Sequence, residues 1–97
     1  MAMYDDILTK LYNDCEKYRN HISDMDELKT AVWQAAQSLA NFEEKELRYF
    51  LQQAEGRLDM IQFTSENIFE DSLEIVSEIT EKIREIKQDI PILKTFW

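Results

Sequence analysis

The chain of 97 residues is poor in the residues that tight turns, disulfides and histidine chemistry require. It has one glycine, one proline, one cysteine and one histidine. Sandwiches and barrels place glycine and proline at their many turns, so one of each excludes a multi-turn β fold. A single cysteine excludes an intrachain disulfide. Basic residues are also scarce, because 11 Lys and Arg stand against 20 Asp and Glu, which gives a net charge of −9.

The charge balance and the lack of long apolar runs exclude further classes of protein. Each third of the chain is net acidic, whereas binding to phosphates requires clustered Lys and Arg. No stretch approaches the roughly 18 apolar residues of a membrane span, and an anionic membrane would repel the acidic surface. Residues 1–6 show neither the basic nor the apolar part of a secretion signal. We expect a cytoplasmic protein without nucleic-acid or membrane partners.

What the sequence does contain favours helices. Hydrophobic residues make up 44% and charged residues 32% of the chain, as in globular proteins. Glu, Lys, Leu, Gln and Ala are frequent, and all of them favour helices. The length corresponds to one domain. We therefore expect a single all-α domain over residues 1–97, a mostly antiparallel four-helix bundle with a short apolar C-terminal tail.

Two helices are predicted in the N-terminal half. The first covers residues 4–22, where apolar residues recur at steps of three and four; these are Tyr4, Ile7, Leu8, Leu11, Cys15, Tyr18 and Ile22. A break follows, and either Ser23 or Asp24 is expected to cap a second helix, with Asp26 or Glu27 completing a capping box. The second helix extends to about Ala40, and its inner face comprises Leu28, Val32, Ala35, Ala36 and Leu39.

The third predicted helix starts at an N-cap on Asn41, with Glu44 at the capping-box position. It is apolar on two nearly opposite sides. One stripe comprises Leu47, Phe50, Leu51, Ala54, Leu58 and Ile61, and the other comprises Phe42, Tyr49, Met60 and Phe63. Such a helix is either central in its bundle or carries a partner-binding face. Gly56 inside this helix marks close packing, a kink or the end of a shorter helix.

The fourth predicted helix covers residues 66–89 after a cap at Thr64–Ser65. Its expected buried stripe comprises Phe69, Leu73, Val76, Ile79, Ile83, Ile86 and Ile90. Pro91 ends the helix, since the residue before a proline is pushed out of the helical region. Residues 92–97 form an apolar tail, which we expect either to fold back on the bundle or to cross to a second subunit.

The opposite side of this fourth helix is acidic. Its carboxylates are Glu66, Glu70, Glu74, Glu78, Glu81, Glu85 and Asp89. Like charges at i,i+4 destabilise a helix by about 0.2–0.5 kcal/mol per pair, and the pairs Glu78–Lys82 and Glu81–Arg84 are expected to offset part of this cost. The acidic side is either a solvated face or a docking strip for a basic partner.

Four aromatic residues cannot easily all reach one small core, namely Tyr49, Phe63, Phe96 and Trp97. Each taken singly is best read as a core residue, but together they predict apolar surface left over for a homodimer or another protein partner. Aromatic side chains contribute strongly to interface energetics. We therefore include these four residues, with the seven acidic ones above, in a candidate partner-binding set.

No catalytic, cofactor-binding or metal-ligating set emerges from the motifs. Di-iron bundles require Glu-x-x-His pairs, which this chain lacks. Residues 43–46 and 55–59 resemble, with altered spacing, the acidic pairs that hold Mg²⁺ in MazG-type nucleotide pyrophosphohydrolases, although first-turn acids also favour a helix dipole. We expect Cys15 to be a buried structural thiol and His21 to be a dipole partner at a helix end.

These observations lead to three functional hypotheses. In size, acidity and helical content the chain resembles bacterial immunity proteins and antitoxins, which neutralise basic nuclease toxins by presenting acidic, aromatic-bearing helices. This resemblance implies a non-enzymatic protein-interaction domain without cofactor, and it covers no residue motif. The alternatives are a homo-oligomeric structural or regulatory protein without an electrostatic partner, and the Mg²⁺-dependent nucleotide hydrolase.

Overall fold

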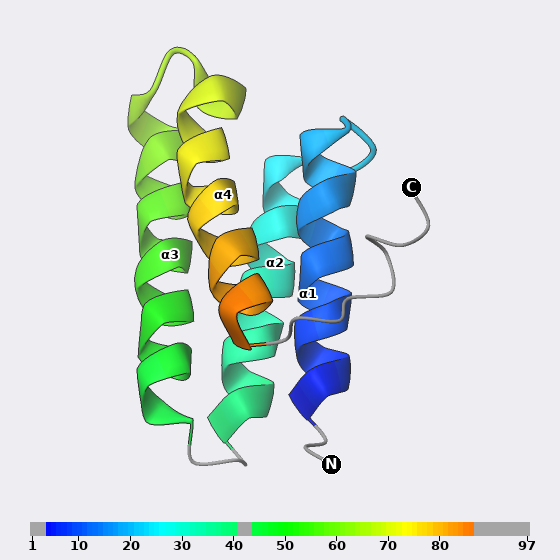
Figure 1. Cartoon of the computed structure of the whole chain (residues 1–97). Helices are drawn as coiled ribbons and strands as arrows, with labels where there is room; N and C mark the ends of the chain where they lie inside the picture. The colour runs from blue at the N-terminus through cyan, green and yellow to red at the C-terminus, as the bar shows by residue number, and fades with distance from the viewer. Residues whose placement is uncertain (1–3, 41–43, 87–97) are drawn as a thin grey trace.

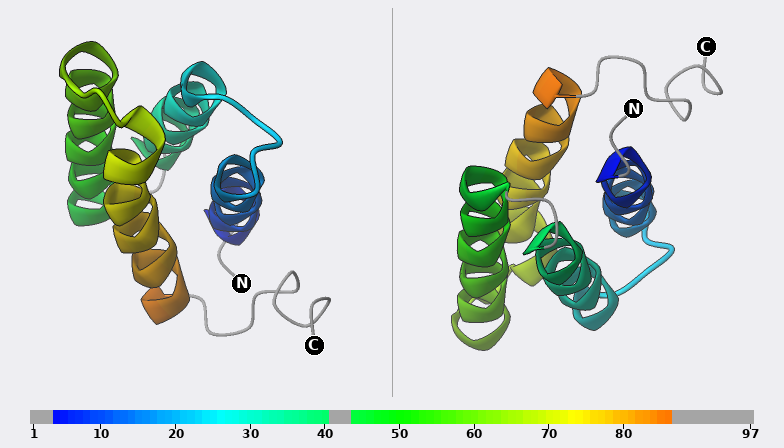
Figure 2. Two further views of the ribbon diagram at one scale, coloured as in Figure 1. Left: turned by 90° about the horizontal axis from the view of Figure 1, so that it is seen from above. Right: turned by 90° about the horizontal axis from the view of Figure 1, so that it is seen from below.

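A computed structural model describes residues 4–40 and 44–86 of the chain. These residues form four helices, α1 (Tyr4–Arg19), α2 (Met25–Leu39), α3 (Lys45–Thr64) and α4 (Ile68–Ile86). The described residues contain no strand, and the expected all-α class is confirmed. Consecutive helices run in alternating directions (Figure 1), and α4 is inclined relative to α1 when the bundle is seen along its length (Figure 2). None of the four helices is long and apolar enough to cross a membrane.

Contacts between side chains confirm that neighbouring helices are antiparallel. Tyr12 of α1 contacts Arg84 of α4, and Tyr18, further along α1, contacts Ser72, which comes earlier in α4. The same reversal relates α2 to α3. The core lies between the four helices, and each helix contributes a stripe of buried apolar residues to it. These residues include Leu8, Leu11 and Cys15 of α1, Leu28, Val32 and Leu39 of α2, Leu47, Leu51 and Leu58 of α3, and Ile75, Ile79 and Ile83 of α4.

The first helix ends three residues before its predicted boundary. The N–H groups of His21 and Ile22 donate to the carbonyl oxygens of Tyr18 and Lys17, at 3.0 and 2.8 Å. This is the Schellman arrangement, which requires a left-handed residue just after the helix, and His21 takes that conformation with a φ of 62°. The chain therefore turns away, and Ile22 is 72% exposed instead of lying on the buried face. Tyr12, which was not predicted to be buried, is 1% exposed.

The predicted capping box at the start of α2 is confirmed, with Asp24 as the capping residue. The Asp24 carboxylate accepts the N–H of Glu27 at 2.9 Å, and the Glu27 carboxylate accepts the N–H of Asp24 at 3.1 Å. All five residues of the predicted inner face are buried. Buried Ala31 extends this face, and the small side chains of Ala31, Ala35 and Ala36 allow neighbouring helices to approach α2.

The third helix is continuous through Gly56. Its predicted N-cap, Asn41, lies outside the described residues; α3 begins at Lys45, after Glu44, whose side chain makes no capping hydrogen bond. Apart from its chain neighbours and the adjacent helix backbone, no atom of the described residues lies within 4 Å of a Cβ built on Gly56. Gly56 therefore marks neither close packing within the chain nor the end of a shorter helix. An exposed glycine inside a helix costs about 1 kcal/mol relative to alanine.

The fourth helix begins two residues later than predicted, and its described part ends at Ile86. Ser65 forms the turn before it, where the Ser65 hydroxyl accepts the N–H of Asn67 at 2.9 Å. Of the predicted stripe, three residues are fully buried, Phe69 and Leu73 are half-buried, and Ile86 is 42% exposed. The burial of Ser72, Ile75 and Thr80 was not predicted. Ile90, Pro91 and the tail of residues 92–97 lie outside the described residues.

Helices α1 and α4 are joined by hydrogen bonds at the edge of the core. The Tyr18 and Ser72 hydroxyl oxygens lie 2.7 Å apart in a buried position. Ser72 uses its single proton to donate to the Phe69 carbonyl oxygen, so Tyr18 is the donor to Ser72. Two further contacts continue the row, from Arg84 to the Tyr12 hydroxyl at 2.7 Å and from Arg19 to the Thr80 hydroxyl at 3.3 Å. We call this row the α1–α4 polar seam.

The buried hydroxyl pair of the α1–α4 polar seam should be measurable in a double-mutant cycle. We expect Tyr18→Phe and Ser72→Ala to be coupled by about 0.5–1.5 kcal/mol, because Ser72→Ala leaves the Tyr18 hydroxyl without its buried acceptor and Tyr18→Phe removes the donor to Ser72. Urea unfolding of the two single variants and the double variant measures this coupling. Tyr49→Phe, which removes an exposed hydroxyl, is the control and should change stability little. Additive effects of the two substitutions would show that the hydrogen bond contributes nothing.

Candidate functional site

The acidic side of α4 faces away from the core. Four of its predicted carboxylates are exposed on the helix, Glu70, Glu74, Glu81 and Glu85, and a fifth, Glu66, is exposed just before it. Within residues 4–40 and 44–86 the four helical carboxylates form no ion pair. Asp89, the seventh predicted member, lies outside these residues. We call Glu70, Glu74, Glu81 and Glu85 the acidic face of α4.

Glu78 differs from the rest of the predicted strip because Arg57 of α3 neutralises it. Two guanidinium nitrogens of Arg57 lie 2.7 and 3.2 Å from the two carboxylate oxygens of Glu78. This bidentate hydrogen bond lowers the pKa of Glu78 and raises that of Arg57. The strip predicted from the sequence is therefore interrupted by an ion pair that ties α4 to α3.

The intrahelical pairs expected to offset the acidic repulsion are replaced by contacts to other helices. The Lys82 ammonium lies 5.6 Å from the centre of the Phe50 ring of α3, a cation–π contact. Arg84 donates to the Tyr12 hydroxyl of α1. Both cations are thus turned toward neighbouring helices, which leaves the outward side of α4 more acidic than its sequence alone indicates.

A groove of about 290 Å³ lies between α3 and α4, beside the acidic face of α4. Met60, Ile61 and Ile75 contribute apolar surface to the groove, and the carboxylates of Asp71 and Glu74 line it from α4. Arg57 of α3, whose guanidinium is bound to Glu78, lines it as well. Asp71 also accepts a hydrogen bond from the Ser65 hydroxyl. The groove therefore combines apolar side chains with at least one carboxylate, Glu74, that is free of an internal ion pair among the described residues.

The second apolar stripe of α3 lies on the surface. Tyr49 is 63% exposed, Met60 67% and Phe63 78%, on the side of the helix opposite the buried Leu51 and Leu58. The prediction that each aromatic residue is singly a core residue is wrong for Tyr49 and Phe63, which both expose apolar surface. Phe42, Phe96 and Trp97 lie outside the described residues.

Polar contacts also join α2 to α3. The Lys29 ammonium lies 2.7 Å from the Asp59 carboxylate and binds the Gln62 side chain, which in turn donates to Asp26 at 3.0 Å. The hydrogen bond to Asp59 raises the pKa of Lys29. Asp59 belongs to the second acidic pair of the hydrolase hypothesis, so one of the supposed magnesium ligands already binds an ammonium group.

The described residues contain no group of three or more His, Cys, Asp or Glu side chains placed to hold a metal ion. Of the first acidic segment, Glu43 lies outside these residues.

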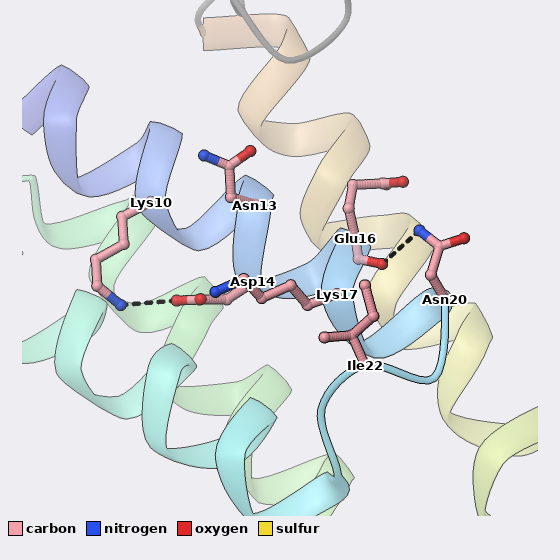
Figure 3. A pocket seen from close by; sticks show the side chains of 7 residues that line it. All are labelled: Lys10, Asn13, Asp14, Glu16, Lys17, Asn20 and Ile22. Atoms are coloured by element: carbon pink, nitrogen blue, oxygen red, sulfur yellow. Dashed lines mark hydrogen bonds and ion pairs between the residues drawn. The ribbon is translucent and has the colours of Figure 1, made fainter. Parts of the chain in front are cut away.

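A hollow of about 450 Å³ along α1 is lined by polar and charged side chains and Ile22 (Figure 3). Four of the lining residues bind one another in pairs, since Lys10 pairs with Asp14 at 2.9 Å and Asn20 donates to the Glu16 carbonyl oxygen.

The sequence singled out two residues with nucleophilic or acid–base side chains, Cys15 and His21. In the structure, both side chains pack against other residues of the fold. Cys15 is fully buried in the core, and burial raises the pKa of its thiol to about 12. The His21 ring stacks on Phe69 with the ring centres 4.2 Å apart. This stacking was not predicted, because it depends on α4 lying beside the end of α1. The left-handed backbone of His21, which belongs to the Schellman turn, was not predicted either.

Comparison of the chain with models of known protein families, with characterised proteins and with solved structures gives no match.

The buried thiol should react slowly in the folded protein. At pH 8.5 the raised pKa lowers the thiolate fraction of Cys15 by about a thousandfold, so we expect alkylation by iodoacetamide to be at least about a hundredfold slower than in urea. Comparable rates in both states would show that Cys15 is accessible.

The raised pKa of Cys15 also makes stability depend on pH. Because the Cys15 thiol of the unfolded chain loses its proton near pH 9, the neutral thiol stabilises the fold fully below pH 9, and this contribution is lost as the pH rises toward 12.

Proposed function

We propose that this chain is a non-enzymatic interaction domain that binds a basic protein partner through the acidic face of α4. It would act in the cytoplasm, without a cofactor and without binding nucleic acid, in the manner of the small acidic helical immunity proteins and antitoxins. The observation that carries the proposal is the row of exposed carboxylates that form no ion pair among the described residues, next to a groove with apolar walls.

The electrostatics of the acidic face favour a cationic partner. Glu70 and Glu74, like Glu81 and Glu85, are four residues apart and repel each other on the same side of the helix. Lys or Arg side chains of a partner would relieve this repulsion while forming new ion pairs. Complementary charge of this kind accelerates association and selects against acidic proteins, so an otherwise unfavourable arrangement on the free protein becomes favourable in the complex.

The groove between α3 and α4 adds an apolar component to this surface. A Lys or Arg side chain has an apolar stem and a charged head. Its stem could lie against Met60 and Ile61 while its head reaches the Glu74 carboxylate. Interfaces usually combine an apolar centre with a polar rim, and this groove provides both within one short stretch of the surface.

The proposal predicts that removing charge from α4 weakens binding more than removing the same charge elsewhere. Glu74→Gln with Glu81→Gln removes two exposed carboxylates from the acidic face, and Asp6→Asn with Glu46→Gln removes two exposed carboxylates outside it. We expect the first variant to raise the Kd for the partner on the order of tenfold, and the second to change it little.

The partner for this measurement is first captured on the immobilised chain from cells of the source organism at low salt, and then purified. Calorimetric titration with the native chain and both variants gives the Kd values at two salt concentrations. Binding should weaken at the higher salt, because ions screen exposed charges. The proposal fails if no basic protein is captured, if salt has no effect, or if both variants lose affinity equally.

A further inference from the structure

One side of α3 is exposed along the whole described helix. Its residues point away from the core and are all exposed, namely Tyr49, Gln52, Gln53, Gly56, Met60 and Phe63. We call this set the outer face of α3. Three of the six are large apolar side chains, and none carries a charge. The exposed Lys45, four residues before Tyr49, lies at the N-terminal end of the same side, and the Lys29 ammonium of α2 lies 5.7 Å from the centre of the Phe63 ring. In a chain in which 32% of the residues are charged, an uncharged face of this length is a distinct part of the surface.

The charge of the elements shows which side of this acidic protein a second copy can approach. Between Lys45 and Thr64, helix α3 has three basic and three acidic residues, whereas α4 between Ile68 and Ile86 has two basic and six acidic residues. Like charges repel across an interface. Two copies of a chain with a net charge of −9 therefore meet with least repulsion through α3 and not through α4.

The order of residues on the outer face of α3 is self-complementary. Tyr49 comes seven residues before Gly56 and Phe63 comes seven residues after it, which places each about 10 Å along the helix from the glycine, at almost the same angle around it. When two such helices lie antiparallel with the two Gly56 residues opposed, each Tyr49 faces Phe63 of the other copy. Gln52 and Met60, four residues on either side, are opposed in the same way.

The absence of a side chain at Gly56 would have a structural role in such a pair of helices. Among the described residues, no atom other than the adjacent helix backbone and the two chain neighbours lies within 4 Å of the position that a Cβ would occupy, so packing within one copy does not require glycine there. At the crossing point of two helices, a residue without a side chain permits close approach of the backbones. The aromatic side chains at both ends can then pack against the opposite helix.

We propose that the outer face of α3 is the interface of an antiparallel homodimer, with its two-fold axis at Gly56. Tyr49, Met60 and Phe63 expose on the order of 400 Å² per copy, and flanking side chains would extend the contact toward the roughly 800 Å² of a standard interface. The dimer leaves the four carboxylates of the acidic face of α4 exposed on both copies, so this inference goes beyond the proposed function. The two proposals share one residue, Met60, which also lines the groove between α3 and α4.

Sedimentation velocity across a range of concentrations tests the interface. We expect the native chain to reach twice its mass of 11.6 kDa at tens of micromolar. Tyr49→Glu with Phe63→Glu should remain monomeric at the same concentrations. The matched control is Ile22→Glu with Trp33→Glu, which adds the same charge at two exposed apolar residues outside the face, 72% and 54% exposed, and should still dimerise. Circular dichroism checks that every variant is folded.

Cross-linking tests the two-fold axis. Gly56→Cys should give a disulfide-linked dimer under mild oxidation, since the two introduced thiols lie at the axis and the buried Cys15 does not compete. A mixture of Tyr49→Cys and Phe63→Cys chains should cross-link between the two variants faster than within either. The proposal is overturned if the native chain stays monomeric, if the Tyr49 and Phe63 variant still dimerises, or if Ile22→Cys cross-links as readily as Gly56→Cys.

Discussion

Each helix of a four-helix bundle can turn only one side toward the shared core, and this constraint governs the surface of the protein. Four stripes of apolar residues fill the space between α1, α2, α3 and α4. Helix α3 has apolar residues on two sides, and only the side with Leu47, Leu51 and Leu58 is buried. Tyr49, Met60 and Phe63 remain exposed to solvent. Exposed patches of large apolar side chains commonly mark contact surfaces.

The contacts between helices also determine which charged side chains are paired and which remain exposed on the surface. Lys82 and Arg84 could have paired with the neighbouring glutamates of α4. Instead, Lys82 lies over Phe50 and Arg84 donates to Tyr12, while Arg57 of α3 binds Glu78. Each cation contributes to holding two helices together. As a consequence, the acidic charge of α4 is concentrated on the side that faces away from the bundle.

The result is a molecule with two surfaces of different character. The acidic face of α4 suits a cationic partner, because the positive charges of the partner would offset the repulsion between its carboxylates. The outer face of α3 is uncharged, belongs to a helix with equal numbers of acidic and basic residues, and suits an equally acidic copy of the chain. The two faces lie on different helices, and Met60 of α3 is the one residue of the outer face that also lines the groove beside the acidic face.

The sequence by itself determined the helical class, the positions of the helices to within a few residues and most of the buried stripe of each. These properties follow from local patterns, such as the three- and four-residue spacing of apolar side chains and the capping box of Asp24 and Glu27. It did not determine which stripe of α3 would be buried, which cation would bind Glu78, or that Tyr12 and Ser72 would be buried. Those outcomes depend on the neighbouring helix at each position, and only tertiary packing brings residues so far apart in the chain into contact.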